Sequence, residues 1–428
     1  MFQANRSSRV YLYMDFVKIK FGPAAQKVAD LSTIMTFVPS KKNQLIPQGK
    51  FSLWKLRFLY TLTIFAFYLV IQRFNLWEHF GVQEMNPSFA DLRSIFSARD
   101  CFQINEPMQI YSKSCDIWNR PFNYPLPTIA LASIVHFTQA SMWILGDLYA
   151  LLLISTLGYW FSYAYSKKPN YLTIVIFLMI GISPATLLLA ERGNYDTVIF
   201  LLFTLGFFWA GKGKTKYASL TFFCAGLLKV YLIPLNLLLA FIDPNPKIRK
   251  LNFWLFTLNL FLFAPTAEVI YRNTPVSLAN SFGFPFFFHL SGQSPIFVYF
   301  VVTVIFLISC LLIKFVSEIT LYFHELRKRV FTSSEVLFLI ALFGFCLPYF
   351  ATVSFNYRII FILPIAVLNY TNVNRRIRIM GLGLFLIQFL VSMSTTLMLS
   401  MYTNTMLLAI VLILLVESIL HWKKSVSL

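Results

Sequence analysis

Long apolar runs separated by short basic segments make up most of this chain. A helix of about 20 apolar residues spans the hydrocarbon core of a bilayer, and its internal hydrogen bonds leave no backbone group unpaired in lipid. The pattern therefore predicts an all-α polytopic membrane protein. The predicted spans are Trp54–Phe74, Met142–Tyr165, Tyr171–Ala190, Thr197–Ala210, Tyr217–Phe241, Leu251–Tyr271, Pro295–Phe315, Val336–Phe350, Ile359–Tyr370, Ile379–Leu399 and Met406–Leu420.

Clusters of Lys and Arg between the apolar runs predict the orientation of the chain. Basic segments beside membrane spans lie on the cytoplasmic side, so these clusters and the N-terminal region are predicted to be cytoplasmic. Segment 75–123 then becomes a large outside loop, together with the turn Glu191–Asp196 and the segments Arg272–Ser294 and Asn356–Arg358. The clusters are Lys167-Lys168, Lys212/Lys214/Lys216, Lys247/Arg249/Lys250, Arg327–Arg329, Arg375/Arg376/Arg378 and Lys423-Lys424.

Two apolar runs are predicted to enter the membrane without crossing it as one straight helix. Tyr217–Phe241 has a basic cluster on each side, so it must cross an even number of times. Two half-length helices that turn near Lys229, inside a cavity lined by protein, satisfy this condition. Tyr124–Phe137 follows an outside loop and becomes a re-entrant half-helix. The total is about 12 transmembrane helices with both termini cytoplasmic.

Composition agrees with a membrane protein and argues against two other classes. The 428 residues are 58% hydrophobic and 12% charged, with a mean hydropathy of +0.68, a balance foreign to soluble domains. The net charge of +19 comes from clusters between apolar runs, so nucleic acid is not an expected partner. Residues 1–53 are polar and mixed in composition, so no cleavable signal peptide is expected and the segment is predicted to be a cytoplasmic extension.

Polar residues on the predicted outer face form a candidate site. Ionisable groups in a bilayer cost about 2.5–3.5 kcal/mol each, so they persist mainly at turns or in functional cavities. Carboxylates beside several cations suit the deprotonation of a hydroxyl while an anionic group such as a phosphate is held. A phosphate inside a membrane points to a lipid carrier. The residues are Asp91, Asp100, Arg192, Asn194, Asp196, Lys229, Asn356 and Arg358.

Plainer interpretations of these residues stay open at this point. Arg192 and Asp196 are four residues apart and could pair with each other, Lys229 could extend to the interface, and Asp91 could be a solvated loop residue. Cys101 and Cys115 share the first loop and could form a disulfide. No metal or cofactor is expected, because the histidines lack ligand spacing and no nucleotide-binding motif is present.

The order of several motifs resembles a family of membrane enzymes. The chain is similar to polyprenyl-phosphate-sugar-dependent glycosyltransferases of the C-type fold, in particular the mannosyl- and arabinosyltransferase-like proteins of glycosyltransferase family 87. Tyr-Pro-Pro and Gly-Gln-Asn are common in the family where this chain has Tyr124–Pro127 and Arg192-Gly193-Asn194. The motifs are the first span, Asp91-Leu92, Ile110-Tyr111, Tyr124–Pro127, Gly193-Asn194 and Ala225–Pro234.

The resemblance implies inverting transfer of a hexose or pentose from a polyprenyl-phosphate carrier to a hydroxyl of a glycan or glycolipid acceptor. Asp91 aligns with the general base of the family, and Lys229 aligns with the lysine that would hold the carrier phosphate with help from Arg192 or Arg358. Asn194 and Asp196 would face the sugar or acceptor. Tyr124 and Tyr231 would line the same substrate site.

The resemblance also implies a location and a division of the chain. The enzyme would lie among the lipids of a bacterial inner membrane, function in cell-envelope polysaccharide biosynthesis, and have its active site facing outside. Residues 54–250, with the loop 75–123, would form the catalytic transmembrane module, and residues 251–428 a C-terminal transmembrane module.

Two other functions stay open at this point. A polysaccharide polymerase or ligase would have a similar number of spans, but its large loop tends to come late in the chain. A flippase or transporter for lipid-linked saccharides would need charges at the membrane midplane along several helices. Here the charges gather at the outer side of the predicted spans, which favours the transferase.

Overall fold

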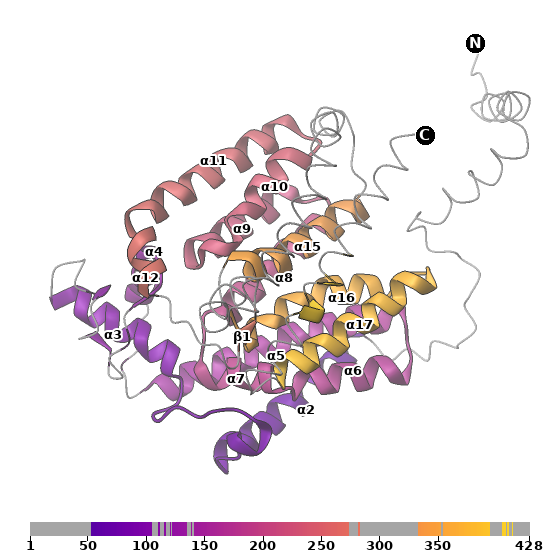
Figure 1. The fold of residues 1–428 in the computed structure, drawn as a ribbon, viewed down its shortest axis with the longest axis horizontal. Helices are drawn as coiled ribbons and strands as arrows, with labels where there is room; N and C mark the ends of the chain where they lie inside the picture. Colours follow the sequence, from indigo (N-terminus) through magenta and orange to yellow (C-terminus); the bar gives the residue numbers. More distant parts are fainter. Residues whose placement is uncertain are drawn as a thin grey trace, which may run out of the picture. The chain divides into compact units, whose positions relative to one another are not determined.

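The described part of the chain is helical. The computed structural model describes residues 53–104, 110–111, 115–116, 120, 122–134, 138, 141–273, 281–282, 333–351, 354–393, 405–407, 409–410 and 413. Within these ranges the helices are joined by one pair of two-residue strands, β1 (Ser281–Phe282) and β2 (Ser354–Phe355) (Figure 1). The predicted span Pro295–Phe315, most of Met406–Leu420 and almost all of the extension 1–53 lie outside the described residues.

Several helices are long and apolar enough to cross a bilayer. Three such segments occur in the described ranges, and a fourth results if α6 and α7 form one bent span. These segments indicate a membrane protein with several spans. The described helices provide fewer crossings than the predicted total of about 12, so that number stays a prediction. The segments are α2 (Leu53–Arg73), α5 (Met142–Lys167), Pro246–Ile270, which contains α11 (Pro246–Phe263), and the pair α6 (Tyr171–Gly181) and α7 (Pro184–Arg192).

The outward faces of α2 and α11 are apolar. On α2, Trp54 and Phe58 are 65% and 57% exposed, and on α11, Trp254 and Phe261 are 58% and 74% exposed. Water-soluble monomers rarely leave so many large apolar side chains uncovered on neighbouring turns. The hydrocarbon of a bilayer covers such faces without cost, which supports the membrane assignment.

Helix α5 lies at the centre of the first half of the molecule. It contacts α2, α6, α7 and α8 (Asp196–Gly211), and also α16 (Leu363–Tyr370). The Trp160 indole N–H donates to Thr204 Oγ1 at 3.0 Å, and the Tyr60 hydroxyl donates to the Phe177 carbonyl at 2.8 Å. The rings of these buried aromatic side chains therefore pack in the core, while their N–H and O–H groups form hydrogen bonds to neighbouring helices.

The predicted span over Tyr171–Ala190 is bent in the structure. The chain forms two helices there, α6 and α7, which meet at a bend of 41°. Ser183 caps the second helix by accepting a hydrogen bond from the Thr186 amide, and Pro184 occupies its first turn. A proline has no N–H for the preceding turn and clashes with its carbonyl, so the helix ends and restarts at this position.

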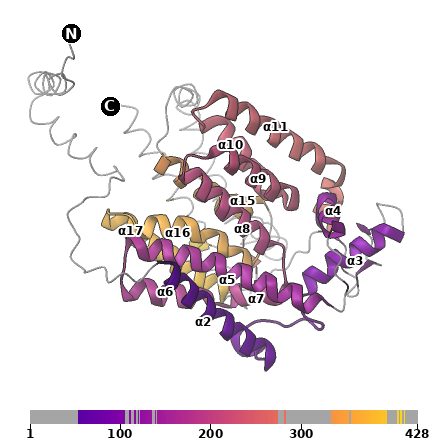
Figure 2. The same cartoon turned by 180° about the vertical axis from the view of Figure 1, so that it is seen from behind.

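The predicted break near Lys229 is confirmed. Helix α9 (Thr215–Leu228) ends at Lys229, which has extended backbone angles, and α10 (Pro234–Ile242) follows after a short 3-10 segment, η6 (Val230–Leu232). The side-chain amide of Asn236 in α10 donates a hydrogen bond to the backbone carbonyl of Ser219 in α9 at 2.9 Å, so α10 runs back along α9. Figure 2 shows these two helices beside α11. Which membrane face the turn approaches stays a prediction.

The polar segment 75–123 contains a helix that the apolar pattern did not predict. Helix α3 (Ala90–Ile104) begins with Asp91 in its first turn and packs against α4 and α7. The predicted half-helix after this loop is α4 (Leu126–Ile134), which is nine residues long. The remaining helical segments are η2 (Trp77–Phe80), η7 (Ala264–Thr266), α12 (Ala267–Asn273), α15 (Ser333–Ala351), η8 (Asn356–Ile362) and α17 (Arg375–Ser392).

We expect Gly206→Ala to destabilise the contact between α8 and α9. A Cβ at Gly206 would lie 2.3 Å from Phe222, whereas a Cβ at Gly383 meets nothing within 4 Å. Overpacking costs about 1–3 kcal/mol, and Gly383→Ala should change stability by less than about 1 kcal/mol. Thermal unfolding of both variants in detergent tests this expectation. Equal melting temperatures for the two would contradict the packing.

Candidate functional site

The candidate residues come from helix ends that are far apart in the sequence. Asp91 lies in the first turn of α3, Asn194 and Asp196 lie at the turn from α7 to α8, and Lys229 lies at the break after α9. Arg358 comes from η8, more than a hundred residues later. Backbone groups at helix ends are not used within the helix, so these turns can bring several polar side chains to one place.

The turn after α7 holds the start of α3. The Phe89 amide donates to the Glu191 carbonyl at 2.9 Å, and the Met85 amide donates to Glu191 Oε1 at 3.0 Å. Gly193 adopts a φ of 58°, and a Cβ there would lie 3.1 Å from Leu92 Cβ. Glycine accepts this left-handed conformation without strain and lets the two segments approach closely. These contacts place Asp91, in the first turn of α3, beside the α7–α8 turn.

Asn194 links the two aspartates of the site. Its amide nitrogen donates to Asp91 Oδ2 at 2.6 Å, across 103 residues of sequence. Its carbonyl oxygen accepts from the Asp196 backbone N–H at 2.8 Å, which is the geometry of an Asx turn. One buried amide side chain therefore fixes the position of Asp91 relative to the N-terminus of α8.

Asp196 is the anchor of two cations. Its side chain is fully buried, and Oδ2 accepts from Arg358 Nε at 2.8 Å. Lys229 Nζ lies 3.8 Å from Oδ1, and the Tyr231 hydroxyl donates to the same oxygen. A buried carboxylate is stable only when it is paired and hydrogen-bonded, and here both oxygens are used.

Aromatic rings support the two cations. Lys229 Nζ lies 4.3 Å from the centroid of the Tyr124 ring, and the Arg358 guanidinium lies 5.8 Å from that of Tyr231. The Tyr111 hydroxyl donates to the Tyr124 carbonyl at 3.2 Å. Burial raises the pKa of Tyr111 to about 12, so this phenol keeps its proton. The cation–π geometry favours the charged forms of both cations beside Asp196.

Arg120 is a member of the network that the sequence did not indicate. Its Nη1 donates to Asp91 Oδ1 at 3.0 Å, its Nη2 to the Ala90 carbonyl at 2.7 Å and its Nε to Asp116 Oδ2 at 2.9 Å. Burial lowers the pKa of Arg120, but the carboxylates of Asp116 and Asp91 raise it by more. Asp116 and Arg120 are four residues apart, a spacing that indicates a local ion pair. No local pattern in the sequence indicates the contact between Arg120 and Asp91.

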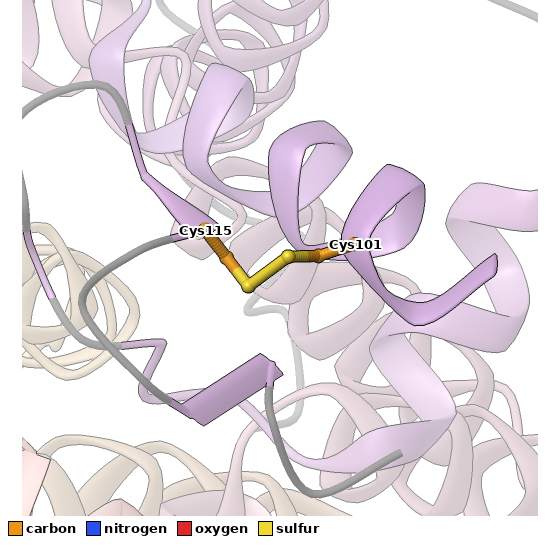
Figure 3. The surroundings of a disulfide bond; sticks show 2 residues. All are labelled: Cys101 and Cys115. Atoms are coloured by element: carbon orange, nitrogen blue, oxygen red, sulfur yellow. A yellow bond between two sulfur atoms is a disulfide. The ribbon is translucent and has the colours of Figure 1, made fainter. Parts of the chain in front are cut away.

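A disulfide joins the end of α3 to the segment that carries Asp116. Figure 3 shows the bond between Cys101 and Cys115, whose Cα atoms are 5.9 Å apart. The pairing that the sequence left open is therefore present. It closes a loop from α3 to the residues around Arg120, and disulfides persist in oxidising compartments. This agrees with the predicted location of the loop outside the cytoplasm.

Arg192 is outside the network. Its Nε lies 3.2 Å from Glu191 Oε2, so the local alternative of a pair between Arg192 and Asp196 is not what forms. Asp196 is also too buried to face a sugar or acceptor, because the side chain has no exposed surface. Seven of the other candidates are joined by the contacts above, namely Asp91, Asn194, Asp196, Lys229, Tyr231, Tyr124 and Arg358. Asp100 pairs with Arg99 instead.

The carboxylates at the site differ in their accessibility. The Asp91 side chain is 19% exposed, whereas that of Asp196 is 0% exposed. Among the described residues, each Asp91 oxygen accepts one hydrogen bond and retains a lone pair for another. Asp91 is therefore the aspartate that an incoming hydroxyl can reach. In the described ranges no three His, Cys, Asp or Glu side chains are arranged to hold a metal ion.

Comparisons with protein-family models, with curated proteins and with solved structures find no match to this chain.

We expect Asp196→Asn to destabilise the protein severely. The change leaves the buried cations Lys229 and Arg358 without their counter-charge, and breaking a buried pair in this way costs about 3–5 kcal/mol. Asp100→Asn is the matched control, because Asp100 is 45% exposed and pairs with Arg99 at the surface. It should change the free energy of unfolding by no more than about 1 kcal/mol. Denaturant titration in detergent tests both, and equal stabilities would refute the anchoring role.

Proposed function

We propose that this protein is an integral-membrane glycosyltransferase. It moves a hexose or pentose from a polyprenyl-phosphate carrier to a hydroxyl of a glycan or glycolipid, with inversion at the anomeric carbon. The observation that carries the proposal is the link from Asp91 through Asn194 to Asp196, Lys229 and Arg358. It joins an accessible carboxylate to a pair of cations in a protein that has several apolar helices.

The reaction assigns a separate role to each end of this network. The acceptor oxygen attacks the anomeric carbon of the donor while Asp91 takes the hydroxyl proton. The bond between that carbon and the phosphate oxygen breaks, and the phosphate leaves with the electron pair. A carboxylate on one side of the sugar and cations on the other suit such an in-line displacement with inversion.

The charges of the network match those of the donor. Lys229 and Arg358 carry two positive charges and Asp196 one negative charge, so this group has one net positive charge. A polyprenyl-phosphate sugar is a phosphodiester with one negative charge, and a second negative charge develops as the sugar leaves. Fixed cations in a water-poor site stabilise that developing charge more than the ground state.

The proposed active site faces the outside of the cell. The disulfide between Cys101 and Cys115 suits an oxidising compartment, and the basic clusters suit the opposite, cytoplasmic face. Both support an active site on the extracytoplasmic side of a bacterial inner membrane. The substrates there are lipid-linked, and their isoprenoid chains would reach the site from the bilayer.

We expect Asp91→Asn to abolish transfer while leaving the protein folded. Loss of the base lowers the rate by about 10²–10⁴-fold, whereas an asparagine at this position keeps the size of the side chain. Membranes containing the variant are incubated with labelled polyprenyl-phosphate hexoses and pentoses and native lipid extract. Transfer of label from donor to a larger glycan or glycolipid is the measurement.

Asp100→Asn in the same helix is the matched control and should keep full transfer. Unimpaired transfer by Asp91→Asn would eliminate the general-base role. Failure of the wild type to consume any donor in the panel would count against the transferase proposal itself.

We expect Lys229→Met to impair the same reaction through the leaving group. Methionine fills the space but carries no charge, and removal of one such stabilising group lowers kcat/KM by about 10²–10³-fold. Lys229→Arg should restore part of the rate, and Lys214→Met, in an exposed basic cluster, should have no effect. Normal kinetics for Lys229→Met would show that this lysine only balances the charge of Asp196 and does not act on the leaving group.

A further inference from the structure

A second candidate ligand site lies between α6 and α17, at the helix ends that carry basic residues. The two helices contact each other, with Phe177 of α6 and Phe385 of α17 having ring centroids 6.0 Å apart (Figures 1 and 2). Between them is a groove of about 180 Å³. We call it the α6–α17 groove. Its lining includes Leu172, Ile176 and Met179 of α6 and Leu382, Phe385 and Leu386 of α17.

The groove is apolar and open to the surroundings of the helices. Leu172, Met179 and Leu386 are 46%, 40% and 56% exposed. An apolar cavity of about 150 Å³ is large enough to hold benzene. The groove therefore has room for a segment of a hydrocarbon chain, and in a membrane such chains are the surrounding solvent.

One end of the groove lies beside a cluster of cations, which we call the basic rim. Lys168 lies in the connection between α5 and α6, three residues before α6 begins. Arg378 lies in α17, about one helical turn before Leu382. Tyr370, at the end of α16, contacts both helices: its hydroxyl lies 3.0 Å from Thr173 Oγ1 of α6, and its ring centroid lies 5.7 Å from that of Phe385 of α17. The basic rim consists of Lys167, Lys168, Arg375, Arg376 and Arg378.

The described residues offer the basic rim no acidic partner. None of its five residues forms an ion pair with a carboxylate in the part of the chain that the structure describes. The Lys168 ammonium lies 4.3 Å from the Tyr370 ring centroid instead. Burial lowers the pKa of Lys168, and the positive charge of Arg378 lowers it further. An external anion at this position would relieve that repulsion.

We propose that the α6–α17 groove and its basic rim bind an anionic phospholipid of the bilayer. The phosphate lies against Lys168 and Arg378, and one acyl chain lies along the groove between α6 and α17. Basic pockets between transmembrane helices are suited to acidic headgroups, and here the lining of the α6–α17 groove begins at Leu172 and Leu382, four residues after the two cations. This site is separate from the Asp91 network, so the inference does not depend on the transferase proposal.

Binding of lipid to the purified full-length protein tests this proposal. Native mass spectrometry compares phosphatidylglycerol with phosphatidylcholine of identical acyl chains. We expect phosphatidylglycerol to bind with at least about tenfold higher affinity. Equal affinities of the two lipids would overturn the proposal.

Three kinds of variant assign the binding to this site. Lys168→Ala with Arg378→Ala should weaken phosphatidylglycerol binding at least about tenfold, whereas the exposed pair Lys212→Ala with Lys214→Ala should not. Leu382→Trp should weaken binding by filling the groove. An equal loss in the Lys212/Lys214 control, or no loss in Leu382→Trp, would overturn the proposed site.

Two further measurements separate lipid binding from misfolding and from binding of soluble phosphate. Lys168→Arg with Arg378→Lys retains the charges and should retain the lipid preference, even if the alanine pair fails to fold. Loss of the preference in this folded variant would count against the proposal. Glycerol 3-phosphate should not displace the lipid, and displacement by it at equal concentration would mean that the basic rim binds soluble phosphate without the groove.

Discussion

The buried carboxylate of Asp196 is the constraint on which the arrangement of the site depends. Lys229 and Arg358 both lie against it, and Arg358 comes from 162 residues further along the chain. A buried cation without a counter-charge is very costly, so the break after α9 and the segment η8 must both meet the start of α8. Asn194 then extends the same network to α3. One buried charge thus fixes the relative positions of four separate elements.

In the proposed transferase, the network separates two tasks that one carboxylate could not perform. Asp196 is enclosed and uses both oxygens to hold cations, so it is a structural and electrostatic group. Asp91 is partly exposed and is held by Arg120 and Asn194 from two sides. A carboxylate that must accept a proton needs access to the substrate, and one that must fix cations needs shelter from water.

The bent pair of α6 and α7 connects the two candidate sites. Helix α6 begins at the basic rim and lines the α6–α17 groove, and α7 ends at the turn that clamps α3. The break at Pro184 lets the pair change direction between them. In the proposed transferase, the lipid at one end would stabilise the helices that position Asp91 at the other.

Local patterns in the sequence were sufficient for the long apolar helices and for most of the candidate residues. Apolar runs predicted α2 and α5 because hydrocarbon burial depends on the length of a run, and the cost of charges in lipid singled out Asp196, Lys229 and Arg358. The basic flanks of one run also predicted the break at Lys229.

The pairings were decided only by the tertiary structure. Arg192 is the near neighbour of Asp196 in sequence, yet Arg358 pairs with it, and Arg120 reaches Asp91 across 29 residues. Such contacts leave no periodic signal, because they depend on where whole helices pack and not on spacing along one of them. The helix α3 was missed for the same reason, since its polar sequence is stabilised by contacts with α4 and α7 and not by an apolar run.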